Sequence, residues 1–169
     1  MKNLFPLFVA ALALAVPAHA GSPSTPLQSV LDRYIQIQTS LAGDSLKGVP
    51  EAASEIAATS KASAGVIPES VAVQAGVMAK ATDIKAARET FKPLSAALIA
   101  ALATEKSISD QYYEAFCPMA NASWIQVGKK IANPYFGSDM LSCGEIRKAV
   151  GGEPHANLPA KSGMGCCGS

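Results

Sequence analysis

The sequence predicts a mainly α protein: an up-and-down antiparallel helical bundle followed by a small irregular C-terminal subdomain. Two observations support this fold class. From Leu27 to about Glu105, apolar residues recur with the spacing of one buried helical face, and alanine is frequent. From Ser107 onward that spacing is lost, while aromatic residues, Pro, Gly and Asn become more frequent.

The first twenty residues predict a cleaved signal peptide. A basic residue at Lys2 is followed by a short apolar core and by the small-x-small sequence Ala18-His19-Ala20. We therefore expect residues 1–20 to be removed, residues 21–150 to form a single helical domain, and residues 151–169 to be a flexible tail. No later segment approaches the about 20 apolar residues that a membrane span needs, so we expect no membrane insertion.

The charge balance of the exported chain is neutral. The full sequence carries 14 basic and 13 acidic side chains, and signal cleavage would remove Lys2. A chain without a basic surplus gives no reason to expect a nucleic-acid partner.

Four helices are predicted in order. The first has its apolar stripe from Leu27 to Leu41. The second begins near Pro50 and runs toward Gly65, because proline suits the first turn of a helix. The third begins near Pro68. Asp83 is a suitable N-cap for the fourth, which we expect Pro93 to end or kink.

The region after these helices contains shorter signals. Residues 112–116 could form an extended segment that leads into Cys117. Pro134 and Gly137 bracket a predicted tight turn, since proline fixes φ and glycine tolerates positive φ. We assign the aromatic residues Trp124, Tyr135 and Phe136 to packing.

The candidate site is a set of sulfur ligands. Cys117 is two residues from Met119, and Met140 is three residues from Cys143, so one turn of helix would direct both members of the second pair the same way. Thiolates and thioethers are soft donors that suit Cu(I), whereas Zn²⁺ seldom takes thioether. The four residues therefore predict a soft-metal site, with Cu(I) as the ion.

The alternative is that Cys117 and Cys143 form a disulfide. Disulfides are the default for cysteines of exported proteins, and this one would contribute about 3 to 4 kcal/mol in the chain-entropy model. Met119 and Met140 would then be flexible apolar residues of the core. The two states could also alternate with the redox conditions.

The C-terminal motif resembles a periplasmic domain family of unknown function. The resemblance also takes in Tyr34, Asp44, Arg88 and Phe91 of the helical region. The motif comprises Cys117-Pro118-Met119-Ala120, Trp124-Ile125, Ile131, Asn133-Pro134-Tyr135-Phe136-Gly137, Met140-Leu141 and Cys143-Gly144. The resemblance implies a periplasmic location, and relatives that occur alone or attached to the periplasmic adaptor proteins of heavy-metal and copper efflux systems. Metal handling is thus the implied role.

The tail contains a further group of soft donors. Met164 precedes the adjacent pair Cys166 and Cys167, with His155 upstream. These residues could form a second soft-metal site or be an unstructured end with two neighbouring thiols, and we favour the latter because ordering a free end costs entropy.

The sequence favours binding over catalysis. It has no Cys-x-x-Cys, no paired-histidine motif and no glycine-rich phosphate loop. We therefore expect a protein that is not an enzyme and that buffers or delivers a soft metal in efflux or resistance. The second hypothesis is a disulfide-stabilised interaction module that docks on an efflux adaptor without metal. A thiol-based redox protein is the third.

Overall fold

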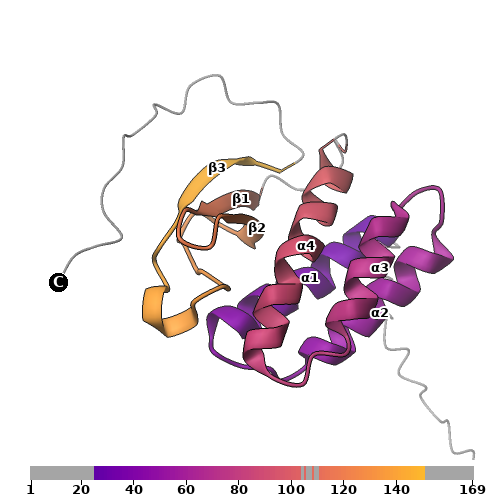
Figure 1. Cartoon of the computed structure of the whole chain (residues 1–169). Helices are drawn as coiled ribbons and strands as arrows, with labels where there is room; N and C mark the ends of the chain where they lie inside the picture. Colours follow the sequence, from indigo (N-terminus) through magenta and orange to yellow (C-terminus); the bar gives the residue numbers. More distant parts are fainter. Residues whose placement is uncertain (1–24, 104, 106–107, 109–110, 151–169) are drawn as a thin grey trace, which may run out of the picture.

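The computed structural model describes residues 25–103, 105, 108 and 111–150. Four helices are followed by a small sheet (Figure 1). The helices are α1 (Pro26–Ala42), α2 (Val49–Ala62), α3 (Glu69–Met78) and α4 (Ile84–Leu102); the remaining elements are β1 (Tyr112–Cys117), β2 (Ala122–Val127), the 3-10 helix η1 (Gly137–Met140) and β3 (Glu145–Ala149). The predicted signal peptide and tail lie outside the described residues.

The four predicted helices are confirmed, and so is the mainly α fold class. Each helix packs on the next one in the chain. Their apolar stripes form one core, in which the largest fully buried side chains include Tyr34, Ile37, Ile56, Phe91 and Leu98. The up-and-down direction of the helices remains a prediction.

Helix ends follow the capping rules. Thr25 accepts a hydrogen bond from the Gln28 amide at 3.1 Å, and Asp83 accepts one from the Ala86 amide at 2.8 Å. These oxygens satisfy amides that have no partner within the first helical turn. The predicted N-cap role of Asp83 is confirmed.

Pro93 was expected to end or kink α4, and the helix continues through it, so it does not end there. The kink stays a prediction. Proline removes one backbone hydrogen bond, which is a local loss. On either side of it Phe91, Leu94 and Leu98 are fully buried. The packing of these side chains against the other helices and the sheet keeps α4 helical where the backbone hydrogen bond is missing.

The prediction of an irregular C-terminal subdomain is also wrong. Residues 112–149 contain a three-stranded antiparallel sheet of order β2-β1-β3. In the register of β1, Cys117 pairs with Ala122 of β2 and Phe116 with Glu145 of β3. The extended segment expected at residues 112–116 is the central strand of this sheet. β2 packs against α4 and α1, which joins the sheet to the helices.

Among the described residues, no helix has the length and apolarity that crossing a membrane requires.

Removal of the tail should leave the fold intact. Val150 is buried and its amide donates to the Tyr112 carbonyl at 2.9 Å, so the last residue with a described role in the core precedes the tail. We expect a chain cut after Val150 to unfold in urea at the same midpoint as the parent. A chain cut after Ala149 should lose about 1.5 to 3 kcal/mol, because it also loses a buried valine. A lower midpoint in the longer truncation would show that the tail stabilises the domain.

Candidate soft-metal centre

The two central cysteines lie side by side although 26 residues separate them. Their Sγ atoms are 3.8 Å apart, and the two residues form no disulfide. Cys117 is fully buried at the end of β1, and Cys143 is 5% exposed just before β3. The antiparallel pairing of β1 with β3 produces this approach, because it brings the segment before Glu145 next to the end of β1. The sequence-predicted cysteine pair is therefore brought together.

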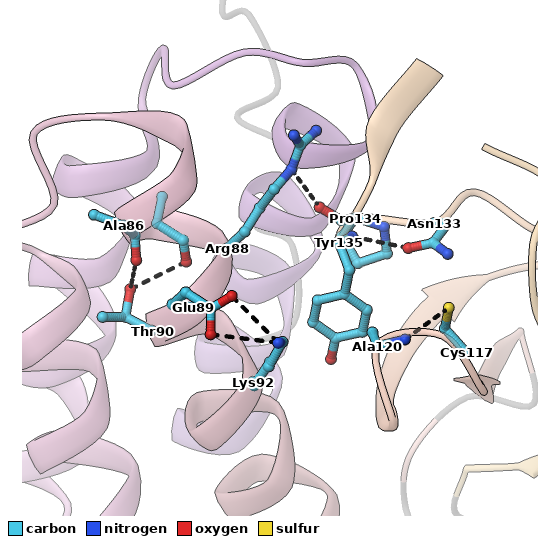
Figure 2. A network of polar contacts seen from close by, with 11 residues as sticks. Ala86, Arg88, Glu89, Thr90, Lys92, Cys117, Ala120, Asn133, Pro134 and Tyr135 are labelled. Carbon is cyan, nitrogen blue, oxygen red and sulfur yellow. Dashed lines mark hydrogen bonds and ion pairs between the residues drawn. The ribbon is translucent and has the colours of Figure 1, made fainter. Parts of the chain in front are cut away.

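The β1–β2 turn sets the position of the Cys117 thiol. The Asn121 amide donates to the Pro118 carbonyl at 3.2 Å, and Asn121 has a positive φ of 48°. Within this turn the Ala120 amide points at the Cys117 Sγ and donates to it at 3.4 Å (Figure 2). The turn thus supplies the Cys117 sulfur with one hydrogen-bond donor.

The two predicted thioether ligands lie in different surroundings. Met119 is in the β1–β2 turn and is 61% exposed. Met140 ends η1, is half-buried and packs against the core. The Cys143 amide donates to the Met140 carbonyl at 2.9 Å, so these two residues are joined by a turn and not by the helical turn that their spacing suggested. Met140 is thus the more buried of the two.

Asn133 holds the segment that carries Cys143. This fully buried side chain donates to the Cys143 carbonyl at 2.7 Å and accepts from the Tyr135 amide at 2.8 Å (Figure 2 draws the latter). The backbone amide of Asn133 donates to the Leu141 carbonyl at 2.8 Å. Asn133 therefore links two loops at the site.

Glycine is required immediately after Cys143. Gly144 has φ of 148°, and a Cβ there would lie 2.7 Å from Cη2 of Trp124. Trp124 is fully buried, with its indole N–H donating to Gln126 at 3.0 Å. The packing role expected for Trp124 is confirmed, since its buried ring lies against Gly144, the residue after Cys143.

A set of stacked aromatic rings connects the site with the helices. Tyr34 of α1 stacks on Phe91 of α4 at 5.0 Å between ring centroids, and Phe91 contacts Tyr135 at 5.9 Å. Tyr135 then meets Trp124 edge to face at 5.9 Å. The packing role of Tyr135 is confirmed.

Buried hydroxyls accompany these rings. The Tyr34 hydroxyl lies 2.7 Å from that of Ser95 and accepts from the Ile125 amide at 3.1 Å, while Tyr135 donates to the Ser123 carbonyl at 2.5 Å. Burial raises the pKa of both tyrosines, so both phenols stay protonated. Neutral phenols thus satisfy the backbone of β2 where it meets α1 and α4.

A charged contact anchors the loop before η1. The guanidinium of Arg88 pairs with Asp44 at 2.6 Å and donates to the carbonyls of Leu41 at 2.9 Å and Pro134 at 3.0 Å (Figure 2 shows the last contact). The other Asp44 oxygen accepts from the Ser138 amide at 2.9 Å. Gly137 lies against this pair with φ of 57°, in the turn that the sequence predicted. One ion pair thus connects two helices with the loop that leads to Met140 and Cys143.

Comparison with known proteins places the helical part in a described class. A family model named "Protein of unknown function (DUF3347)" matches residues 30–110. The matched range contains most of α1 and all of α2, α3 and α4, and it ends before β1. Neither the curated proteins nor the solved structures contain a match. The match therefore shows that the helical part is similar to a domain of unknown function, and it does not include the cysteine pair.

Substitution of Gly137 should be more damaging than substitution of a glycine of similar backbone conformation. In Gly137→Ala the new Cβ would overlap the Asp44 carboxylate and the Arg88 guanidinium. Gly128 has φ of 72° with open space around it, so Gly128→Ala isolates the backbone cost of about 1 to 2 kcal/mol. We expect Gly137→Ala to lose more than this in urea unfolding. Equal losses would show that the loop moves away from Asp44 without cost.

The Asp44 contact should make stability depend on acid pH. The hydrogen bond from Ser138 and the Arg88 guanidinium lower the pKa of Asp44 to about 2, from an ordinary value of 3.8. Because the folded state binds the proton less readily, this contribution is fully present above pH 3.8 and is lost as the pH falls through about 2. Asp44→Asn should flatten the decline in stability between pH 4 and pH 2. An Asp44 carboxyl that titrates near 3.8 in the NMR spectrum of the folded protein would contradict this.

Proposed function

We propose that this protein binds a soft metal ion, Cu(I) above all, between Cys117 and Cys143, and buffers or delivers it in metal efflux or resistance. The single observation that supports this is the 3.8 Å separation of the two sulfurs. Two thiolates that share a tetrahedral metal, each about 2.3 Å from it, are about 3.8 Å apart. The backbone therefore already holds the thiols at a separation suited to a shared ion.

The donor chemistry supports a soft ion over a hard one. Within the part of the chain that the structure describes, no group of three or more His, Cys, Asp or Glu residues is placed to hold a metal. The sulfur donors nearest in sequence to the two thiols are the thioethers of Met119 and Met140. Sulfur ligands of both kinds select Cu(I), and thioethers are poor ligands for Zn²⁺. Met140, which is half-buried and accepts the backbone hydrogen bond from Cys143, is the thioether we assign as a ligand before the exposed Met119.

Entry of an ion requires only a local opening. Residues 141–144 lie between η1 and β3 outside any helix or strand, and Leu141 and Ser142 are exposed. Short irregular segments of this kind open at lower free energy than the strands and helices around them. The ion would reach the thiols from the Leu141 side and displace their protons to solvent.

The alternative function is a disulfide-stabilised interaction module that docks on an efflux adaptor without metal. The burial of both cysteines favours it, because a buried disulfide needs no access to solvent. The two sulfurs would have to approach from 3.8 Å to about 2.05 Å. Both functions place the protein in the periplasm, which the predicted signal peptide and the sequence resemblance support, and both leave an efflux adaptor as the expected partner.

The metal-site proposal is tested by titrating the reduced protein with Cu(I) against a competing chelator. Cys117→Ser and Cys143→Ser should each weaken binding more than about 100-fold, because losing a direct ligand exceeds the loss typical of its supporting contacts. Met140→Leu should weaken binding less and leave folding almost unchanged, since the side-chain volume is conserved. Met119→Leu is the matched control at an exposed position.

Equal Cu(I) affinity in all these variants and the parent would refute the proposal. If the pair is a structural disulfide instead, both serine variants should lose similar stability under oxidising conditions, while the methionine variants match the parent.

A further inference from the structure

Helix α3 is apolar on two sides, and only one of them is covered. Apart from Glu69, Ser70 and Gln74, its ten residues are apolar or glycine. One side packs against α2 and α4 and contains the buried residues Val71, Ala72, Ala75 and Met78. The opposite side exposes Val73 and Val77, with Val73 51% exposed. Because a helix that is apolar all round is normally buried all round, the exposed side indicates a partner.

The exposed residues form one row along the helix, which we call the α3 row. Residues three, four and seven apart lie on the same side of an α-helix. The row consists of Glu69, Val73, Gly76, Val77 and Lys80. The Lys80 amide continues the last turn by donating to the Val77 carbonyl at 3.1 Å. In Figure 1, α3 lies on the side of the bundle away from the sheet, whose strand β2 contacts α4 and α1. The α3 row is therefore separate from the cysteine pair.

The charges of the α3 row are complementary to a second copy of the same row. Glu69 begins α3 and Lys80 lies just beyond its end; both are exposed, and neither forms an ion pair with another described residue. Two antiparallel copies can be centred between Gln74 and Ala75. Glu69 of each copy then lies opposite Lys80 of the other, because the two residues are equally far from the centre. Such self-matching is what a two-fold dimer requires.

The middle of the α3 row has room for a second helix. In the same arrangement, Val73 of one copy lies opposite Gly76 of the other, again at equal distances from the centre. Apart from the backbone of α3 and the chain neighbours of Gly76, no described atom lies within 4 Å of the place where a Cβ of Gly76 would stand. Glycine lowers the stability of a helix interior and is useful where another chain must come close. Val77, beside Gly76, adds a second apolar contact to the opposing valine.

We propose that α3 is a self-association face, through which two copies of the chain pack antiparallel into a two-fold dimer. A helix of ten residues is about 15 Å long, so this contact is smaller than the about 1,200 Å² that a standard stable interface buries. We therefore expect reversible association with a Kd between about 1 μM and 1 mM. The dimer needs neither a metal nor the cysteines, so it is independent of the proposed function.

A second copy fits the α3 row better than a membrane surface does. Helices that lie on anionic membranes carry many Lys and Arg residues beside a face of large side chains such as Leu, Phe and Trp. The α3 row has one basic and one acidic residue, and its other residues are valine and glycine. This composition suits close packing between two helices.

Sedimentation equilibrium of the reduced mature chain, between about 10 μM and 1 mM, measures this association, and the reductant prevents disulfides between chains. Val73→Glu should weaken it at least about 10-fold, because it places two like charges near the two-fold axis. The matched control is Val127→Glu, which changes an equally exposed valine (50%) of β2 and should leave the Kd unchanged. A parent that stays monomeric at about 1 mM would overturn the proposal, and so would equal losses in the two variants. A monomeric parent that binds anionic vesicles, with binding lost in Val73→Glu, would assign the row to a membrane instead.

Exchange of the two charges tests the antiparallel arrangement. Glu69→Lys or Lys80→Glu alone places like charges opposite each other at both ends of the pair, so each should weaken self-association about 5-fold. In an equimolar mixture of the two variants the opposing charges again differ in sign, so a mixed dimer should form with the Kd of the parent. The far-ultraviolet circular dichroism of both variants should match that of the parent, which excludes loss of helix as the cause. A mixture that associates no better than its components would refute the arrangement.

Discussion

The contacts of Arg88 are the constraint on which the rest of the structure depends. Its guanidinium satisfies the carbonyl at the end of α1, the carboxylate of Asp44 and the carbonyl of Pro134, so one side chain of α4 joins three segments. Arginine suits this role because its donors lie in a fixed plane and it stays charged at every relevant pH. From the loop, the backbone amide of Ser138 donates to the second carboxylate oxygen of Asp44. These contacts fix the loop that leads to Met140 and Cys143 relative to the helices.

Apolar packing and neutral hydrogen bonds complete the attachment of the sheet. The rings of Tyr34, Phe91, Tyr135 and Trp124 alternate between helices and the C-terminal region, so the core is continuous across the boundary. Gln38 of α1 adds a buried hydrogen bond at 2.7 Å to the Ala132 carbonyl. Because these contacts come from both parts, the helices and the sheet share one hydrophobic core, although the family model stops at residue 110. The helices can therefore be regarded as the support for the loops that carry the sulfurs.

Sequence reasoning predicted the helices because their apolar spacing is regular and their caps are chemically explicit. It did not predict the sheet, since the strands are short and β3 is mostly exposed and charged, which leaves no alternating pattern to detect. It allowed for Pro93 to end α4, which it does not, because helix propensity takes no account of the packing of Phe91 and Leu94. The approach of Cys117 and Cys143 could be anticipated from composition alone. The roles of Asn133, Gly137 and Gly144 could not, because they depend on partners far away in the sequence.

The chain contains a single tryptophan, Trp124, whose ring lies against Gly144, the residue that follows Cys143. Its indole packs against Tyr135 and bonds to Gln126, so every neighbour of the ring that is described above belongs to the C-terminal region. The protein thus carries an intrinsic fluorophore at the sulfur pair and none of the same kind in the helices. Tryptophan fluorescence, excited selectively at the indole, will report the state of the loops around the thiols. The far-ultraviolet circular dichroism of the same sample will report the helices. The two halves of the molecule can be followed separately without any added label.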